Sequence, residues 1–243
     1  MKRVMFFVYG LICYLVFFTS FVYMIGFLTN SWVPKSVDSG EVGAFGPSLL
    51  INLGLIALFG LQHSVMARPG FKAAWTRLVP KPIERSTYVL LGSSLLWLLY
   101  ALWQPMPTSL FSLDGTLARQ IAVGLCLVGF LIVLLATLAI DHFDLFGLRQ
   151  VFLYLRGKPY HQRGFAVPTM YRFVRHPLYV GWFVAFWVTP DFTIGHLVYA
   201  AGMTACILIA IPFEERDLVS FLGDDYRRYR ETTPMLIPHL RRR

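Results

Sequence analysis

The chain of 243 residues is 56% hydrophobic, 16% aromatic and only 14% charged, and its mean hydropathy is +0.59. A chain this apolar is not an ordinary soluble domain, and its aromatic content excludes an intrinsically disordered one. Its three cysteines, Cys13, Cys126 and Cys206, lie in separate apolar runs, which excludes a disulfide framework or a C-x-x-C metal site. We predict an all-α polytopic membrane protein, whose net charge of +9 reflects loops at an anionic membrane surface and not a nucleic-acid partner.

Six apolar runs predict about six transmembrane helices, or five if one run does not cross. Most of them approach the roughly 20 residues that a helix needs to cross a bilayer. The fifth run is too short to cross alone, so we expect it to form a tilted hairpin with the sixth, closed by Pro190 and Asp191. The first run lacks a small-residue cleavage site, which indicates a retained helix and not a signal peptide. The runs cover residues 4–28, 49–66, 88–103, 121–140, 178–189 and 196–213.

The distribution of basic residues over the loops predicts the orientation. If the N-terminus is inside, 20 of the 22 Lys and Arg residues fall on the inner side, and only Lys35 and Arg119 fall outside. This is the bias of the positive-inside rule, and a wrong helix count would scramble it. We therefore expect both termini to face the cytoplasm.

Four polar clusters fall at helix ends on this predicted inner face. Ionisable residues at membrane depth are costly, which makes them candidates for function. Each cluster also has a structural explanation: arginines anchor to phosphates, His63 bonds a neighbouring helix, and Glu214 and Glu215 pair with loop arginines. Their convergence on one face favours a functional site. The clusters are 62–68, 84–88, 141–150 and 171–179, the last of which the hairpin joins to the two glutamates.

The predicted terminal hairpin offers groups that suit a zwitterionic nucleotide. A helix that begins at Pro177 presents free N–H groups, which together with Arg175 and His176 suit a carboxylate. Glu214 can accept from an ammonium group or from sugar hydroxyls. S-adenosylmethionine carries all of these groups, although any zwitterionic nucleotide would satisfy the pattern. Three nearby rings suit a purine or a sulfonium: Tyr171, Phe173 and Tyr179.

Two spaced motifs carry a family resemblance. The motif R-H-P-L-Y-V-G at 175–181 and the motif E-E-R-D-L at 214–218, followed by Tyr226 and Pro234, resemble the membrane methyltransferases typified by isoprenylcysteine carboxyl methyltransferase. Stretches 62–68, 84–88 and 142–150 are similar to the bacterial methanethiol S-methyltransferases and their NnrU-type relatives, over nearly the whole chain. This implies one integral-membrane methyltransferase domain over residues 1–243, in the bacterial inner membrane, with the cofactor mainly within 141–233.

The resemblance implies S-adenosylmethionine as the cofactor, without a metal. Where the prenylcysteine enzymes place an arginine one turn before the first glutamate, this chain has Ala210, so a carboxylate acceptor loses its expected partner and a small apolar thiol does not need one. The implied cofactor-binding residues are Phe165, Tyr171, Arg175, His176, Pro177, Tyr179 and Glu214.

The resulting hypothesis is methylation of methanethiol to dimethyl sulfide, with S-adenosylhomocysteine as the second product. The enzyme must generate the thiolate. His63 or His142 could take the thiol proton, and the fixed charge of Arg149 could lower the thiol pKa. The neutral product could leave through the membrane lipid.

Three other readings stay open at this stage. In the first, the cofactor is kept and the acceptor is a lipid, isoprenoid or prenylcysteine-like molecule. In the second, the chain is a non-enzymatic haem or quinone protein that uses histidines near helix ends, which are His63, His142, His176 and His196. In the third, the chain is a non-catalytic membrane regulator that binds no cofactor. The sequence leaves the oligomeric state unknown.

Overall fold

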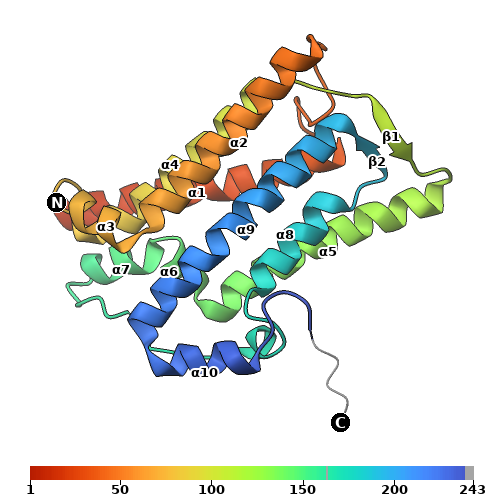
Figure 1. The fold of residues 1–243 in the computed structure, drawn as a ribbon. Helices are drawn as coiled ribbons and strands as arrows, with labels where there is room; N and C mark the ends of the chain where they lie inside the picture. Colours follow the sequence, from red (N-terminus) through yellow and green to blue (C-terminus); the bar gives the residue numbers. More distant parts are fainter. Residues whose placement is uncertain (163, 239–243) are drawn as a thin grey trace.

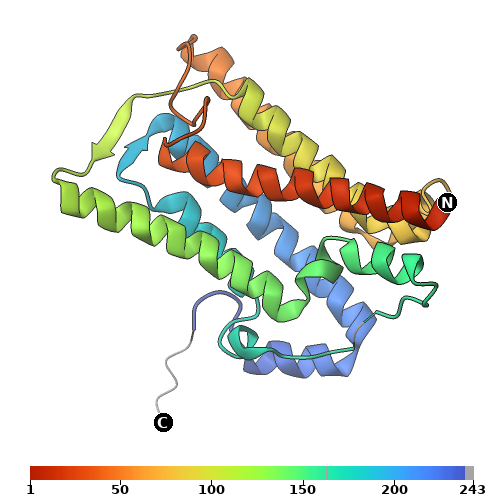
Figure 2. The ribbon, with the colours of Figure 1, turned by 180° about the vertical axis from the view of Figure 1, so that it is seen from behind.

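A computed structural model describes residues 1–162 and 164–238 as a bundle of long helices with short helices gathered at one end (Figure 1). Helix α1 packs against α4, α2 packs against α4 and α9, and α5 packs against α8 (Figure 2). The long helices are α1 (Lys2–Thr29), α2 (Phe45–Ala67), α4 (Lys81–Leu102), α5 (Thr116–Ile140) and α9 (Ile194–Leu222). The short ones are α3 (Pro69–Trp75), α6 (His142–Leu145), α7 (Leu148–Leu155), the 3-10 helix η1 (Thr169–Arg172), α8 (Pro177–Trp187) and α10 (Asp224–Thr232).

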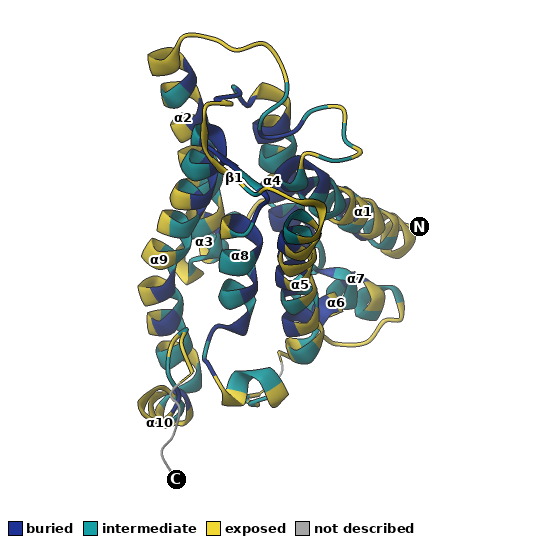
Figure 3. Cartoon of the chain, turned by 90° about the vertical axis from the view of Figure 1, so that its right-hand side faces the viewer, coloured by how far each residue is buried: buried dark blue, intermediate teal, exposed yellow. Residues whose placement is uncertain are grey.

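Four helices, α1, α2, α5 and α9, are long and apolar enough to cross a membrane, which confirms the class of helical membrane protein. Their outward faces carry exposed apolar side chains. Figure 3 shows the exposed positions of these helices in yellow. Helix α4 is not among the four, because Lys81, Glu84 and Arg85 occupy its first turns. The predicted count of about six spans is therefore not confirmed.

Helix α8 is short, as the sequence predicts. Its 11 residues extend about 16 Å at 1.5 Å per residue, roughly half of a hydrocarbon core of about 30 Å. It lies against α5, where the two backbones touch at Gly129 and Gly181. A Cβ atom on Gly129 would lie 2.5 Å from the backbone nitrogen of Ala185 and 2.8 Å from the carbonyl oxygen of Gly181. Only glycine permits this close crossing, which fixes the position of α8.

A two-stranded antiparallel ribbon lies at the opposite end from the short helices (Figure 1). Strand β1 (Ser109–Ser112) pairs with β2 (Asp191–Thr193) and brings Phe111 opposite Phe192. Arg119 holds the ribbon by donating to Asp191 over 2.8 Å, and this hydrogen bond lowers the pKa of the Asp191 carboxyl. This ribbon was not predicted from the sequence. Lys35 and Arg119, the two basic residues outside the predicted inner side, both lie at this end.

Candidate active site

The joint between η1, α8 and α9 is built on a buried carboxylate. Glu215 accepts on one oxygen both from Nε of Arg175, over 2.7 Å, and from Nε2 of His176, over 3.0 Å. His176 is 5% exposed and Glu215 is 8% exposed. A buried carboxylate is retained only where charge and hydrogen bonds compensate for the lost water, which Arg175 and His176 do here. The structure therefore places the donors of Arg175 and His176 on Glu215, a residue that the sequence analysis treated as a loop partner.

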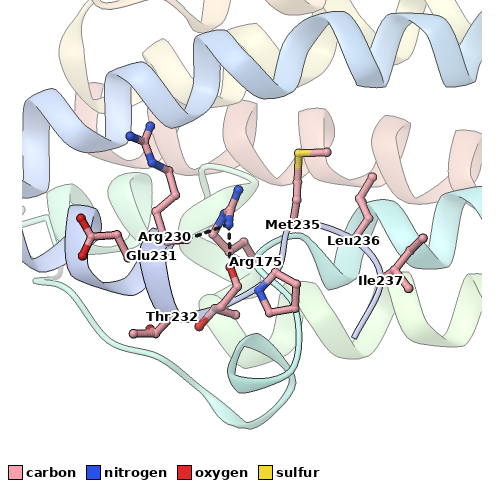
Figure 4. Close-up of a pocket in the computed structure, with 9 residues that line it drawn as sticks. Arg175, Arg230, Glu231, Thr232, Met235, Leu236 and Ile237 are labelled. Atoms are coloured by element: carbon pink, nitrogen blue, oxygen red, sulfur yellow. Dashed lines mark hydrogen bonds between the residues drawn. The ribbon is translucent and has the colours of Figure 1, made fainter. Parts of the chain in front are cut away.

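Arg175 also fastens the segment that follows α10. It donates to the carbonyl oxygens of Arg230 (3.0 Å) and Thr233 (2.6 Å) (Figure 4). The backbone N–H of His176 donates to the carbonyl oxygen of Met235. Arg175 and residues 230–237 line a pocket of about 480 Å³. The basic side chain thus connects α8, α9 and the C-terminal segment at the short-helix end of the bundle.

The neighbouring glutamate, Glu214, faces a different set of groups. Tyr179 donates its hydroxyl to Glu214 over 2.6 Å, and Tyr171 and Tyr88 lie within electrostatic range of the same carboxylate. Burial, and then the charge of Glu214, raises the pKa of Tyr171, so this hydroxyl stays protonated at neutral pH. Because Glu214 is only half-buried, it remains accessible to a ligand.

Aromatic rings close the side of the site next to α10. The ring of Phe165 lies 5.7 Å from that of Tyr229 and 6.5 Å from that of Tyr226. Tyr229 donates to the carbonyl oxygen of Tyr171 over 2.6 Å, and burial raises the pKa of Tyr229 to about 12. The predicted cofactor residues Phe165 and Tyr171 are therefore joined through Tyr229. Tyr229 was not predicted from the sequence, although its spacing of three residues from Tyr226 places both on one face of a helix.

His63 lies on α2 and faces the interior of the bundle. Leu61 and Val65 form part of the exposed apolar face of α2, and at about 100° per residue His63 lies on the opposite side. Its ring lies 5.4 Å from that of Phe59 and 5.3 Å from that of Tyr88, whose hydroxyl donates to the His63 carbonyl. His63 is nevertheless solvent-accessible. An accessible imidazole on an inward face can reach a bound molecule, and Tyr88 connects it with Glu214.

His142 and Arg149 belong to a different cluster, around α6 and α7. Nδ1 of His142 lies 2.9 Å from the hydroxyl of Thr137, and Nε2 lies 2.8 Å from that of Tyr14. Thr137 donates its own proton to Leu134, so it must accept from Nδ1–H, which leaves Nε2 to accept from Tyr14. Burial lowers the pKa of His142 and keeps it neutral. Both ring nitrogens are thus engaged in holding α6 to α1 and α5.

Arg149 is matched by acidic side chains. Its guanidinium lies 3.2 Å from Asp144 and 4.0 Å from Asp141, and above the ring of Tyr160. Arg85 lies nearer to His63: it stacks on Tyr88 at 4.9 Å and donates to the carbonyl oxygen of Leu145. The structure therefore brings His63 together with Arg85, and places Arg149 in a separate ion-pair cluster. From the sequence, Arg85 was predicted only as a member of a polar cluster and as an anchor to lipid phosphates.

The histidines of the haem alternative have other partners. Nε2 of His176 bonds Glu215, both nitrogens of His142 bond hydroxyls, and Nε2 of His196 lies 2.8 Å from the carbonyl oxygen of Phe186. Axial ligation of a haem through either nitrogen of His142, or through Nε2 of His176 or His196, would break one of these hydrogen bonds. The geometry therefore gives the haem alternative no support.

Comparison with known proteins shows the family of the chain. The chain is 50% identical to a methanethiol S-methyltransferase of Mycobacterium tuberculosis, over 98% of both chains. It is 48% identical to a methanethiol S-methyltransferase of Crocosphaera subtropica, over 99% of this chain and 94% of that one. The chain belongs to the methanethiol S-methyltransferase family. It is also 26% identical to Nurim of Pan troglodytes over 83% of this chain and 81% of that one, which fits the wider isoprenylcysteine methyltransferase-like group.

Neither a family model nor a solved structure matches the chain. Membership of the methanethiol S-methyltransferase family confirms the predicted resemblance and makes the protein an enzyme. The similarity to these proteins includes α1 to α7 as well as the terminal motifs, so the family assignment applies to the whole helical bundle.

Proposed function

We propose that this protein transfers a methyl group from S-adenosylmethionine to the sulfur of methanethiol and releases dimethyl sulfide and S-adenosylhomocysteine. The observation that carries the proposal is the similarity, at about half of all positions and over nearly the full length, to proteins that bear this activity in their names. The lack of an arginine at Ala210 supports a small apolar acceptor.

The residues around Glu214 fit a cofactor with an ammonium group, a ribose and a purine. Glu214 is the accessible acceptor for the ammonium group or the ribose hydroxyls, and Tyr179 orients it. Phe165 and Tyr171 offer rings to the purine, and Pro177 starts the helix whose positive end faces the site. Arg175 and His176 act through Glu215, by holding the joint on which these groups sit. The bound cofactor supplies an electrophilic methyl group.

His63 is the proposed acceptor of the thiol proton. A neutral imidazole at an accessible position on the inner face of α2 can accept a proton, and His142, with both nitrogens engaged, is less suited to that role. A positive charge near the sulfur would lower the thiol pKa further. Arg85 is better placed for this than Arg149, whose charge is offset by Asp144 and Asp141.

The basic end of the bundle is proposed to face the cytoplasm of a bacterial inner membrane. The loops with most of the basic residues and the short helices lie at this end, as the positive-inside rule expects. The cofactor would then reach the site from the cytoplasm, and the volatile thiol and its product would move through the surrounding lipid.

A competition of acceptors tests this function. Purified protein with S-adenosylmethionine should convert methanethiol efficiently, and should not form a methyl ester on a prenylcysteine analogue. Gas chromatography measures dimethyl sulfide, and mass spectrometry measures the ester. Ester formation in preference to dimethyl sulfide would reverse the choice of acceptor and favour the lipid-like alternative.

A further inference from the structure

Two contacts between α2 and α9 enclose the stretch of each helix that carries a proposed site residue (Figure 1). At the first contact the helices touch, because a Cβ atom on Gly60 would lie 2.6 Å from Sγ of Cys206. At the second contact Arg68, which ends α2, donates from Nη1 to the carboxylate of Asp217 on α9 over 2.7 Å. The proposed base on α2 and the proposed cofactor ligand on α9 both lie between these contacts along the chain.

The second contact holds Arg68 in a fixed orientation. Its Nε donates to the carbonyl oxygen of Ser64, one turn earlier on α2, over 3.0 Å. Its guanidinium also lies 6.0 Å from the ring of Phe213, which shares a face of α9 with Asp217 four residues later. The rigid planar guanidinium is therefore bonded to its own helix on one side and to α9 on the other, so it sets the separation of the two helices.

The end of α9 is held independently of α2. Tyr179 on α8 donates to Glu214, and Arg175 donates to Glu215. Helix α2, by contrast, is the least buried of the four long apolar helices. Loss of the ion pair between α2 and α9 would therefore shift α2 against a cofactor site that stays in place.

We propose that Arg68 is a positioning residue for methyl transfer: through Asp217, it sets the distance between His63 on α2 and the cofactor held at Glu214 on α9. This inference rests on the function proposed above. The sulfur that gives its proton to His63 uses the freed electron pair to attack the methyl group, whose bond to the cofactor sulfonium breaks. Base and methyl donor must therefore both be within reach of one sulfur atom. A displacement of about 1 Å in such an arrangement can lower the rate about 100-fold.

The test removes each partner of the ion pair while keeping its shape. Arg68→Met keeps the apolar stem of the side chain, and Asp217→Asn keeps the size of the carboxylate. The matched control is Arg228→Gln, which removes an ion pair of the same length, 2.7 Å, that lies within α10 and joins no other helix.

We expect Arg68→Met and Asp217→Asn each to lower kcat for methanethiol at least about 10-fold. The dissociation constant of S-adenosylmethionine should change by less than about twofold, because α8 still holds Glu214. The unfolding temperature should move by no more than about 4 °C, because partly exposed ion pairs add little stability. The double variant should be no slower than the single ones, because both remove the same contact. Arg228→Gln should match the wild type.

The outcomes separate this inference from the proposed function. If the wild type forms dimethyl sulfide and both variants turn over like Arg228→Gln, the ion pair does not position α2, and the function stands. A loss of cofactor affinity as large as the loss of rate would contradict the inference, and so would a slow Arg68→Met beside a normal Asp217→Asn. If the wild type binds the cofactor but methylates no thiol, the proposed function fails and the positioning role with it.

Discussion

Adjacent glutamates on α9 have different partners, and this difference separates binding from stability. Glu214 is half-buried and accepts from Tyr179, whereas Glu215 is buried and neutralises Arg175. One step along a helix turns a side chain by about 100°, which is enough to direct one carboxylate to the ligand site and the other to the joint.

This difference predicts opposite outcomes for two equivalent substitutions. Glu214→Gln should weaken S-adenosylmethionine binding at least about 10-fold, because a charged hydrogen bond is lost, while the unfolding temperature moves by only about 2 °C. Glu215→Gln should cost roughly 3–5 kcal/mol, because Arg175 is left buried without its counter-charge. Calorimetric titration and thermal unfolding in detergent measure both. Normal cofactor binding by Glu214→Gln would remove Glu214 from the site.

His142 predicts how stability depends on pH. Because burial lowers its pKa in the folded state, the unfolded chain binds this proton first as the pH falls below about 6.5, and the folded state loses stability from that point downward. The unfolding temperature of the wild type should therefore fall between pH 7.5 and 5.5, and fall less in His142→Gln, which retains an amide for Tyr14. Parallel curves for the two proteins would show that His142 does not titrate in this way.

At the scale of single residues, the sequence predicted the site only in part. The terminal motifs placed Tyr171, Tyr179 and Glu214 together, because the motif spacing and the hairpin bring them to one end. Two other contacts were not predicted: His176 bonds Glu215, and Gln62 lies next to Gly92. Both depend on how one helix is rotated against another, which a single sequence does not determine.

Among the elements, the crossing of α5 and α8 carries the site. Because Gly129 and Gly181 let the backbones touch, α8 holds Tyr179 and the start of the hairpin at a fixed height against α5. The sequence predicted the shortness of α8 from its apolar run of about a dozen residues. It did not predict the β1–β2 ribbon, whose four and three residues pair over a long separation in the chain and form no local pattern.

The crossing predicts a strong effect for a small change. Gly129→Ala places a methyl group against backbone atoms of α8 that cannot move aside, so it should cost about 1–3 kcal/mol and weaken cofactor binding as α8 shifts. Gly124→Ala, on an open face of the same helix, is the control and should change neither property. Unfolding in denaturant and calorimetric titration measure these effects. Equal stability of the two variants would contradict the close crossing.

For the whole molecule, the two ends of the bundle differ in charge and in structure. The ribbon end holds Lys35 and Arg119, and the other end holds most of the basic loops, the short helices and the site. Composition and charge were enough to predict a helical membrane protein with this asymmetry. The number of crossings was harder to predict, because α4 begins with charged turns and α8 is short.

The asymmetry predicts the topology. Reporters that are active only in the cytoplasm should be active when fused to either terminus in a bacterial host, and inactive when inserted in the 104–115 segment, which contains β1 and leads into α5. A reporter that is active in the 104–115 segment but inactive at both termini would show that the orientation is the reverse of the one proposed.

The central claim is that this protein methylates methanethiol with S-adenosylmethionine. The most direct measurement supplies purified protein with methanethiol and with S-adenosylmethionine that carries a deuterated methyl group, and analyses the headspace by gas chromatography with mass spectrometry. The account predicts dimethyl sulfide with one labelled methyl group per molecule, formed in step with S-adenosylhomocysteine. At a cofactor concentration that saturates half of the wild type, a 10-fold weaker affinity should lower the rate of Glu214→Gln at least about fivefold. S-adenosylhomocysteine formed without labelled dimethyl sulfide, or label found only in lipid, would contradict it.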